Sequence, residues 1–383
     1  MSKTMNSFEN ICLCALNNIF GYEPRIAFAL IENLGSASEV FSLSQEQKDQ
    51  LLGSYSKYRG RLTQKEIDTA ALMLKRAEEA GATFVGVTSG DYPERLRQCP
   101  DAPVGLFVRG KDSPSEIFST RNFVAIVGTR DLTPYGETAC RELVRKLSCA
   151  ENPPCIVSGL ALGVDIVAHT QALECGMPSI AVMATGPEDV YPRRHREFAR
   201  SLACQSASAL VTDYPPGTAP VALNFIRRNR IIAGLSDCVI LVESAVKGGG
   251  MVTCRQAFSY DRSVYVLPGR LGDRHSEGCN LLVREGVAEI VNSLDDLNCR
   301  LGLGRDVVRR SDRRLESRYA GVLPGDKLRM ITEILTLVRG NWGITVEEVA
   351  ARFDSPFSAV SELVNLLEAD GFLKIDLLRR CTV

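Results

Sequence analysis

The sequence predicts an α/β fold in which a doubly wound, mostly parallel sheet forms the central domain, residues 83–297. Apolar runs of about four to six residues recur between residues 123 and 267, and several are followed by a glycine-containing turn and a stretch of helical spacing. Strands that are apolar on both faces and joined through helices are typical of a parallel sheet that helices cover on both sides.

The strands and helices of this domain are expected to alternate along the chain. Strands are expected at 123–127, 155–158, 179–183, 210–213, 238–243 and 264–267. Helices are expected at about 136–147, 164–174 and 253–260. In such a sheet the turns that lead from strand to helix all lie at the carboxyl edge, where ligands bind.

A small helical region precedes the sheet. Apolar residues recur at helical spacing in 11–19 and 26–34, and Gly21 and Gly35 punctuate them. A third helix is expected at 63–80. Together these segments predict an N-terminal helical domain, residues 1–82.

Two further regions follow the sheet. Residues 298–322 are rich in Arg and show no periodicity, which is typical of a linker. Residues 323–383 resume helical spacing in three segments and end in a short hairpin, which predicts a winged-helix domain. The acidic side chains of this last region argue against strong binding to duplex DNA.

The composition excludes several classes of protein. No apolar run reaches the roughly 18 residues of a membrane span, and the first twenty residues lack the apolar core of a signal peptide. The thirteen Cys include no C-x-x-C pair, which favours free thiols in a reducing cytosol. The three His form no H-E-x-x-H motif. We therefore expect a cytoplasmic protein without a metal site, although its net charge of −1 leaves local basic clusters free to bind polyanions.

Three glycine-containing turns are expected to meet at the carboxyl edge, namely Gly128–Arg130, Gly159–Gly163 and Gly248–Gly250. Glycine lets a backbone approach a ligand closely, and the following helix N-terminus offers unpaired N–H groups to an anion. The glycines could instead simply form tight turns. With Arg130 inside one turn, the three together favour a phosphate-binding rim.

The turns do not match the common nucleotide-binding motifs. The first turn reads G-T-R-D-L-T-P-Y-G and lacks the G-x-G-x-x-G pattern of dinucleotide-binding proteins. Gly163 is followed by Val-Asp, where a nucleoside-triphosphate loop has Lys and Ser or Thr. The turns therefore predict neither a dinucleotide nor a nucleoside triphosphate as the ligand.

The segment Asn224–Arg230 combines a stacking surface with positive charge. Phe225 stands beside Arg227, Arg228 and Arg230. Arg guanidinium groups match phosphate oxygens, and an aromatic face can stack a base, so the pattern suits single-stranded nucleic acid. A solvated basic turn with Phe225 in the core is the alternative.

Catalytic groups are not apparent in the sequence. Asp165 and His169 lie four residues apart on a predicted helix, where they could form an acid–base or metal pair. A contact that merely stabilises the helix explains the spacing better. No nucleophile elbow, no Cys–His pair and no pair of carboxylates is recognisable, but catalytic groups can also converge from distant positions in a chain.

A series of ordered motifs extends over residues 85–295. It includes Asp91-Tyr92-Pro93, Val124–Arg130, Ser158–Asp165, Tyr191-Pro192, Asp213–Gly217, Asn224–Leu235 and Pro268-Gly269. These motifs resemble those of the DprA/Smf (DNA-processing protein A) family.

The resemblance implies an extended Rossmann-like fold with a SAM-like helical domain before it. It implies a non-catalytic protein without a cofactor that binds single-stranded DNA and forms a homodimer through the Rossmann-like domain. It also implies that the protein protects incoming DNA and helps load RecA recombinase in natural transformation. The implied DNA-binding residues are Gly128, Arg130, Gly159, Gly163, Asn224, Phe225, Arg227, Arg228, Arg230, Gly248, Gly249, Gly250 and Thr253.

The chain departs from the family pattern at a few positions. Ile226 stands where the family usually has Pro, His195 where it often has Asn, and Gly248–Gly250 where it has Ser-Gly-Ser. These are changes of loop shape. Gly21-Tyr22-Glu23 lacks the second Gly of a helix-hairpin-helix, which argues against DNA binding by the N-terminal helices.

Two other functions stay open. An enzyme similar to the LOG (lysine-decarboxylase-like) phosphoribohydrolases would share the Rossmann core, but those enzymes have a catalytic Glu where this chain offers Gln256. A transcription regulator would act through residues 325–383. For a DNA-binding protein we expect Arg130→Ala and Arg228→Ala to weaken binding with little loss of folding.

Overall fold

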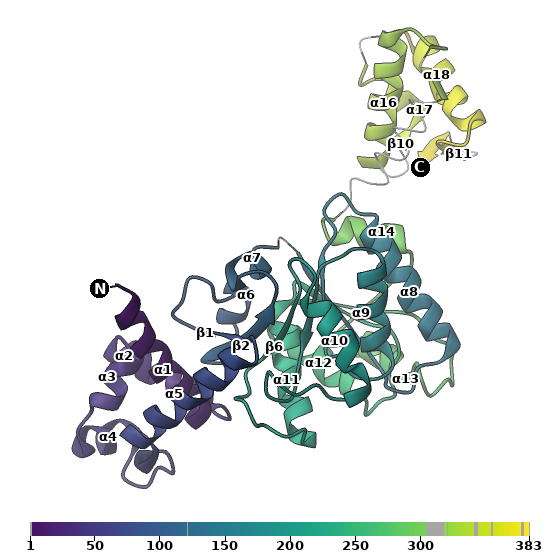
Figure 1. The fold of residues 1–383 in the computed structure, drawn as a ribbon. Helices are drawn as coiled ribbons and strands as arrows, with labels where there is room; N and C mark the ends of the chain where they lie inside the picture. Colours follow the sequence, from purple (N-terminus) through teal and green to yellow (C-terminus); the bar gives the residue numbers. More distant parts are fainter. Residues whose placement is uncertain are drawn as a thin grey trace. The chain divides into compact units, whose positions relative to one another are not determined.

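One large sheet organises the first part of the chain in the computed structural model (Figure 1). The chain divides into two compact units, Met1–Leu303 and Gly304–Val383. The residues that the structure describes are 2–120, 122–303, 318–319, 321–340, 344–353, 355–376 and 379–382.

The sheet has the strand order β1-β2-β6-β5-β4-β3-β7-β8-β9. Its pairs from β6 through β9 are parallel, whereas β2 pairs antiparallel with both β1 and β6. The mostly parallel, doubly wound sheet is therefore confirmed. The strands are β1 Thr83–Gly86, β2 Gly105–Gly110, β3 Phe123–Val127, β4 Cys155–Ser158, β5 Ser179–Val182, β6 Ala209–Thr212, β7 Cys238–Leu241, β8 Ser263–Val266 and β9 Glu289–Ile290.

Helices cover both faces of the parallel strands, and side chains alternate between the two apolar cores. In β3, Ala125 and Val127 belong to the core that α11 and α12 cover, while Val124 and Ile126 face the core that α8 and α9 cover. The helices that follow β1 are α6 Glu94–Arg97, α7 Pro114–Phe118, α8 Pro134–Ser148, α9 Val164–Glu174, η2 Arg193–His195, α10 Arg196–Ala203, α11 Ala222–Leu235, α12 Gly249–Ser259, α13 Glu277–Arg284 and α14 Leu294–Arg300.

The N-terminal helices share the core of the sheet and belong to the same compact unit (Figure 1). The buried side chain of Asn17 donates to the Asp213 carbonyl over 2.7 Å and accepts from the Gly105 N–H. These bonds fix the first helix to the ends of β2 and β6. The helices are α1 Ser2–Phe20, α2 Pro24–Leu34, α3 Ala37–Ser42, α4 Gln45–Leu52, η1 Arg59–Arg61 and α5 Gln64–Glu79.

The second unit has its own apolar core, to which Ile331, Val349 and Leu363 contribute. The three helices expected from the sequence are present. The expected hairpin corresponds to the antiparallel pair β11–β12, to which β10 adds a third strand, and the winged-helix assignment stays a prediction. Among the described residues of the whole chain, no helix combines the length and the apolar character needed to cross a bilayer. The elements are α16 Gly325–Gly340, β10 Ile344–Thr345, α17 Val346–Ala350, α18 Phe357–Ala369, β11 Lys374–Ile375 and β12 Arg380–Thr382.

Two predicted boundaries differ from the structure by more than two residues. Helix α12 begins at Gly249, four residues before the expected start, because Gly249 and Gly250 belong to a helix N-terminus and not to a loop. Gly250 allows this start, since a Cβ there would lie 2.6 Å from Leu241. The predicted linker 298–322 overlaps the sheet unit, where α14 continues to Arg300 and Leu303 is buried; its residues 304–317 lie outside the described residues.

A buried ion pair holds α11 to the end of β6. Arg230 donates to the Asp213 carboxylate over 2.5 Å and also to the Asp101 carbonyl. We expect Asp213→Asn to lower the free energy of unfolding by about 3–5 kcal/mol, because it leaves a buried guanidinium without its counter-charge. Chemical denaturation followed by circular dichroism measures this change.

The control is Glu197→Gln, which breaks an exposed pair with Arg200 one turn along a helix. Exposed pairs contribute little to stability, so this variant should unfold at the same denaturant concentration as the wild type. Equal behaviour of the two variants would contradict a structural role for the Arg230–Asp213 pair.

Candidate nucleic-acid interface

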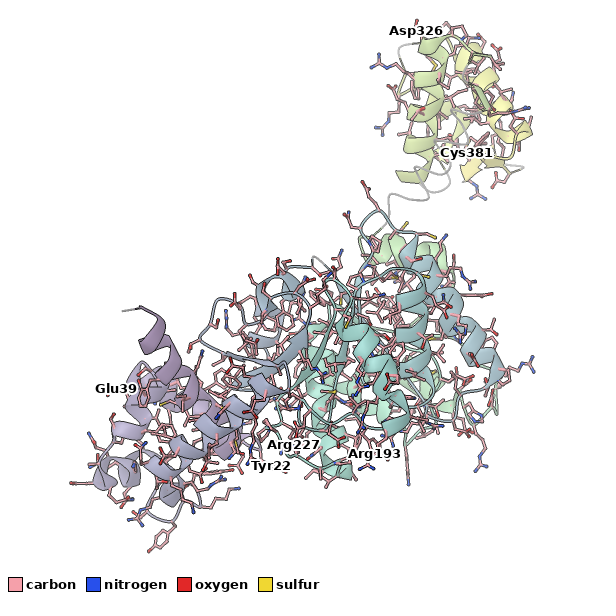
Figure 2. All side chains as sticks on the ribbon, viewed as in Figure 1. Tyr22, Glu39, Arg193, Arg227, Asp326 and Cys381 are labelled. Atoms are coloured by element: carbon pink, nitrogen blue, oxygen red, sulfur yellow. The ribbon has the colours of Figure 1, made fainter. Side chains whose placement is uncertain are left out.

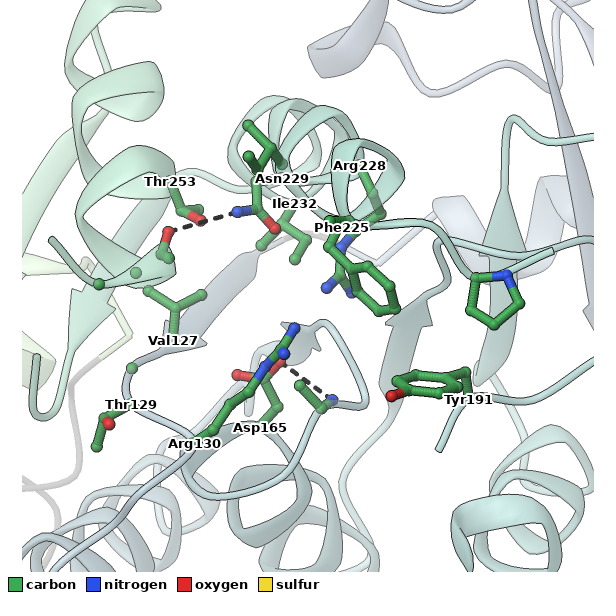
Figure 3. Close-up of a pocket in the computed structure, with 18 residues that line it drawn as sticks. Val127, Thr129, Arg130, Asp165, Tyr191, Phe225, Arg228, Asn229, Ile232 and Thr253 are labelled. Atoms are coloured by element: carbon green, nitrogen blue, oxygen red, sulfur yellow. Dashed lines mark hydrogen bonds between the residues drawn. The ribbon is translucent and has the colours of Figure 1, made fainter. Parts of the chain in front are cut away.

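A pocket of about 540 Å³ opens at the carboxyl edge of the sheet (Figure 3). It lies where the chain reverses its direction of travel through the sheet, since β4, β5 and β6 follow on one side of β3 and β7 and β8 on the other. Ligands of doubly wound sheets bind at such a switch point. The pocket is lined by Val127, Gly128, Thr129, Arg130, Ala161, Asp165, Tyr191, Pro220, Ala222, Phe225, Ile226, Arg228, Asn229, Ile232, Gly248, Gly249, Gly250 and Thr253.

The loop after β3 is held in place by the end of β7. Glu243 is buried, and its carboxylate accepts from the N–H and the hydroxyl of Thr133, the N-cap of α8. The Glu243 carbonyl accepts from the Thr129 N–H over 2.8 Å. Gly128 is required because a Cβ there would lie 2.4 Å from Val164 and 2.8 Å from the Glu243 carbonyl oxygen. Glu243 therefore has a structural role: it holds the loop after β3, which carries Gly128, against the end of β7.

The N-terminus of α12 forms one wall of the pocket. Gly248, Gly249 and Gly250 all line it, and the first N–H groups of a helix have no partner within that helix. Asn229 of α11 donates to the Gly249 carbonyl over 3.4 Å, which ties this terminus to the facing helix. Free N–H groups and the helix dipole favour an anion at this wall.

Arg228 forms the floor of the pocket and is only 3% exposed. Its guanidinium donates to the Gly159 carbonyl over 2.6 Å and to the Val182 carbonyl, which lie at the carboxyl ends of β4 and β5. Burial lowers the pKa of Arg228 to about 10, so the group is a cation at neutral pH. Because the Arg228 side chain is buried, we now expect Arg228→Ala to lower the stability of the protein, contrary to the expectation from the sequence.

An acidic side chain, Asp165, also lines the pocket. Burial raises the pKa of Asp165, and the nearby Arg228 acts against that rise. The Asp165 carboxylate also accepts from the Ala161 N–H over 3.3 Å. Exposed Arg130 adds a further positive charge to the pocket.

Aromatic rings form the opposite wall. The Arg130 guanidinium lies 5.2 Å from the centre of the Phe225 ring, and the Phe225 and Tyr191 rings meet edge to face with centroids 5.4 Å apart. Arg130 and Arg228 point towards each other from opposite sides of the pocket (Figure 3). The pocket therefore combines N–H donors, a guanidinium and ring faces around one cavity.

Eight of the thirteen predicted site residues line this pocket, and five do not. Gly159 and Gly163 pack against residues that line the pocket. A Cβ on Gly159 would clash with Arg228, and a Cβ on Gly163 would clash with the Thr129 carbonyl oxygen. The side chain of Asn224 donates to the Ala184 and Ala219 carbonyls and fixes the loop before α11.

Arg227 and Arg230 were expected in the groove, and the structure places them elsewhere. Arg227 donates to the Gly21 carbonyl over 2.6 Å, and Arg230 is buried against Asp213. Their positions follow from the helical repeat of 3.6 residues, which turns both side chains away from the face that carries Phe225 and Asn229. Three neighbouring Arg in a sequence thus have three different roles.

Several lining residues were missed by sequence reasoning. Tyr191 and Asn229 each stood in a motif of the sequence, but neither was predicted as a binding residue. Helical spacing from Phe225 to Asn229 could have indicated that these two residues share a face. Asp165 was weighed only as a partner of His169, which instead contacts the Ser179 hydroxyl over 2.7 Å.

The sequence predicts no metal site, and this stays a prediction. Among those residues, no three His, Cys, Asp or Glu side chains converge as metal ligands would. Burial lowers the pKa of His169 to about 3, so its ring is neutral at physiological pH.

A comparison with protein families matches residues 83–302 to the family described as DNA recombination-mediator protein A. The chain belongs to this family. The resemblance to DprA/Smf proteins is thereby confirmed.

Two curated relatives illustrate the relationship. Protein Smf of Escherichia coli is 39% identical over 228 residues, which are 59% of each chain. DNA processing protein DprA of Streptococcus pneumoniae is 36% identical over 206 residues, 54% of this chain and 70% of that protein. The match therefore spans about three fifths of the length of the Escherichia coli relative.

Two solved structures confirm the fold class. DprA of Streptococcus pneumoniae superposes with a TM-score of 0.63 at 27% identity, covering 74% of this chain and 95% of that one. DNA processing protein A of Helicobacter pylori gives a TM-score of 0.51 at 29% identity, covering 58% and 97%, and is described as having a unique single-stranded DNA binding mode.

The packing of Gly159 against Arg228 is directly testable. A Cβ at position 159 would lie 2.1 Å from the Arg228 guanidinium, which cannot retreat without losing its two carbonyl partners. We expect Gly159→Ala to lower the free energy of unfolding by about 1–3 kcal/mol. Gly60→Ala is the control, because a Cβ there meets nothing within 4 Å. Equal stability of the two variants would contradict a rigid floor.

Proposed function

We propose that this protein is a non-catalytic, cytoplasmic single-stranded-DNA-binding protein and that the strand lies in the pocket at the β3–β7 switch point. The observation that carries the proposal is the convergence of the α12 N-terminus, Arg130 and the Phe225–Tyr191 pair on one cavity. Each of these groups suits a different part of a nucleotide. The family of the chain and the described DNA binding of the Helicobacter pylori relative support it.

Different groups in the pocket suit different parts of a nucleotide. The N–H groups of Gly249 and Gly250 and the guanidinium of Arg130 suit phosphate oxygens. The Phe225 and Tyr191 rings suit bases, and such stacking tolerates any sequence. A duplex hides its base faces within its own stack, so the rings favour a single strand.

Handing the strand to a recombinase is the further part of this proposal. A protein that holds DNA through a small pocket leaves the remaining strand accessible, as loading of RecA in natural transformation requires. Assembly as a homodimer through the Rossmann-like domain would place two such pockets on one DNA molecule. Filament assembly by RecA on DNA coated with a single-strand-binding protein, with and without this chain, tests the loading step.

Arg130 provides the sharpest test of the binding site. Its guanidinium is exposed and lies against Phe225, so Arg130→Ala should remove a phosphate contact without disturbing the core. We expect weaker binding of a fluorescent single-stranded oligonucleotide. The plot of log affinity against log salt concentration should become shallower by about 0.7, the value for one phosphate contact.

The matched control for Arg130→Ala is Arg145→Ala, which removes an exposed guanidinium from the last turn of α8. This variant should keep the affinity and the salt dependence of the wild type. Equal titrations of wild type and Arg130→Ala, or an equal loss in both variants, would refute the assignment of the pocket.

The non-catalytic part of the proposal has a separate test. Gln256 lies on α12 where the phosphoribohydrolases carry a catalytic Glu, and it is not among the residues that line the pocket. We expect incubation with nucleoside monophosphates to release no free base, as chromatography would measure. Release that Arg130→Ala abolishes would identify the pocket as an active site instead.

A further inference from the structure

A second pair of cation and aromatic ring lies outside the pocket. The Arg227 guanidinium stacks on the Tyr22 ring at 3.6 Å from its centroid, and it donates to the Gly21 carbonyl over 2.6 Å (Figure 2). Tyr22 belongs to the turn between α1 and α2, and Arg227 belongs to α11, which also carries Phe225 and Arg228. The pair therefore joins the N-terminal helices to the helix that forms a wall of the pocket.

The position of Tyr22 relative to the pocket is fixed. The buried amide of Asn17 binds the Asp213 carbonyl, and Asp213 is in turn paired with Arg230 of α11. Gly21 is held by Arg227 itself, and a Cβ at Gly21 would lie 2.8 Å from the Asn17 carbonyl oxygen. A ring held in this way loses little conformational entropy when a ligand stacks on it.

Much of the Tyr22 ring is nevertheless open to solvent. One face is covered by the guanidinium, yet the residue is 59% exposed. A base could stack on the uncovered face, and a cation on the far side of the ring adds to the positive potential that a nucleic acid would meet. A ring that served only to lock two helices together would be expected to be buried.

The surface between the pocket and Tyr22 is apolar and exposed. Ile226 lines the pocket and is 51% exposed, and Leu223 is 53% exposed. Leu223 and Arg227 are four residues apart on α11 and share a face of the helix, while Ile226 lies between that face and the pocket. An exposed apolar path thus runs across the first two turns of α11, from the pocket rim to the Tyr22–Arg227 pair.

We propose that Tyr22 and Arg227 form a second base-stacking subsite, which receives single-stranded DNA as it leaves the pocket across Ile226 and Leu223. This proposal rests on the proposed function, because it extends the same strand. It revises the expectation that the N-terminal helices do not contact DNA: the turn Gly21-Tyr22-Glu23 lacks a helix-hairpin-helix glycine, but its ring replaces that backbone contact with stacking.

The experiment compares short and long strands on the full-length protein. Fluorescence anisotropy would measure the affinity for single-stranded oligonucleotides of about 6 and about 20 nucleotides, which bracket common site sizes. We expect Tyr22→Ala to weaken binding of the long strand by about tenfold, the effect of losing one stacked base. Binding of the short strand, which the pocket alone holds, should stay within about twofold.

Two variants serve as controls. Tyr22→Phe keeps the ring and should bind the long strand as the wild type does. Tyr55→Ala removes a fully exposed tyrosine from the same helical region and should change neither affinity. The melting temperature of each variant, measured in parallel, identifies any general loss of structure.

The outcomes separate the two proposals. Unchanged affinity of Tyr22→Ala for the long strand would overturn the subsite and leave the pocket intact. Equal weakening on both strand lengths with a lowered melting temperature would also overturn it, since Tyr22 would then act only as a lock between helices. Wild-type protein that binds neither strand would overturn the proposed function together with this extension.

Discussion

The shape of the pocket depends on one buried cation. Arg228 extends from α11 under the sheet edge and binds carbonyl oxygens at the ends of β4 and β5. A charge in this position is costly to bury, and two carbonyls and the nearby Asp165 offset that cost. In return α11 is fixed at a set distance from the strand ends, so the Phe225 wall and the glycine rim face each other across a preformed cavity.

Different faces of helix α11 have different roles. The face that carries Phe225, Ile226 and Asn229 lines the cavity, whereas Arg227 and Arg230 on the other flank join α11 to the N-terminal helices and to the end of β6. A single element therefore forms the binding wall, anchors the strand ends and connects the two structural layers. These contacts explain why the polar side chains of Asn224, Arg228, Asn229 and Arg230 in α11 are buried.

The sequence predicted the six strands β3 to β8 because nearly all of their residues are apolar and buried. It did not predict β1, β2 or β9, and β1 and β9 contain exposed residues. It predicted the rim well because glycine turns must gather at one edge of a parallel sheet. It could not separate Arg227, Arg228 and Arg230, since their partners Gly21, Gly159 and Asp213 are distant in the chain. The contribution of Tyr191 was likewise hidden, because only folding brings it beside Phe225.

A crystal structure of the protein with a short single-stranded oligonucleotide tests the central claim most directly. We predict a phosphate within hydrogen-bonding distance of the Gly249 or Gly250 N–H and of Arg130, a base against Phe225, and an Arg228 side chain that keeps its two carbonyl partners. A strand bound at another surface with this cavity empty, or an Arg228 that leaves the floor to contact phosphate, would contradict the account.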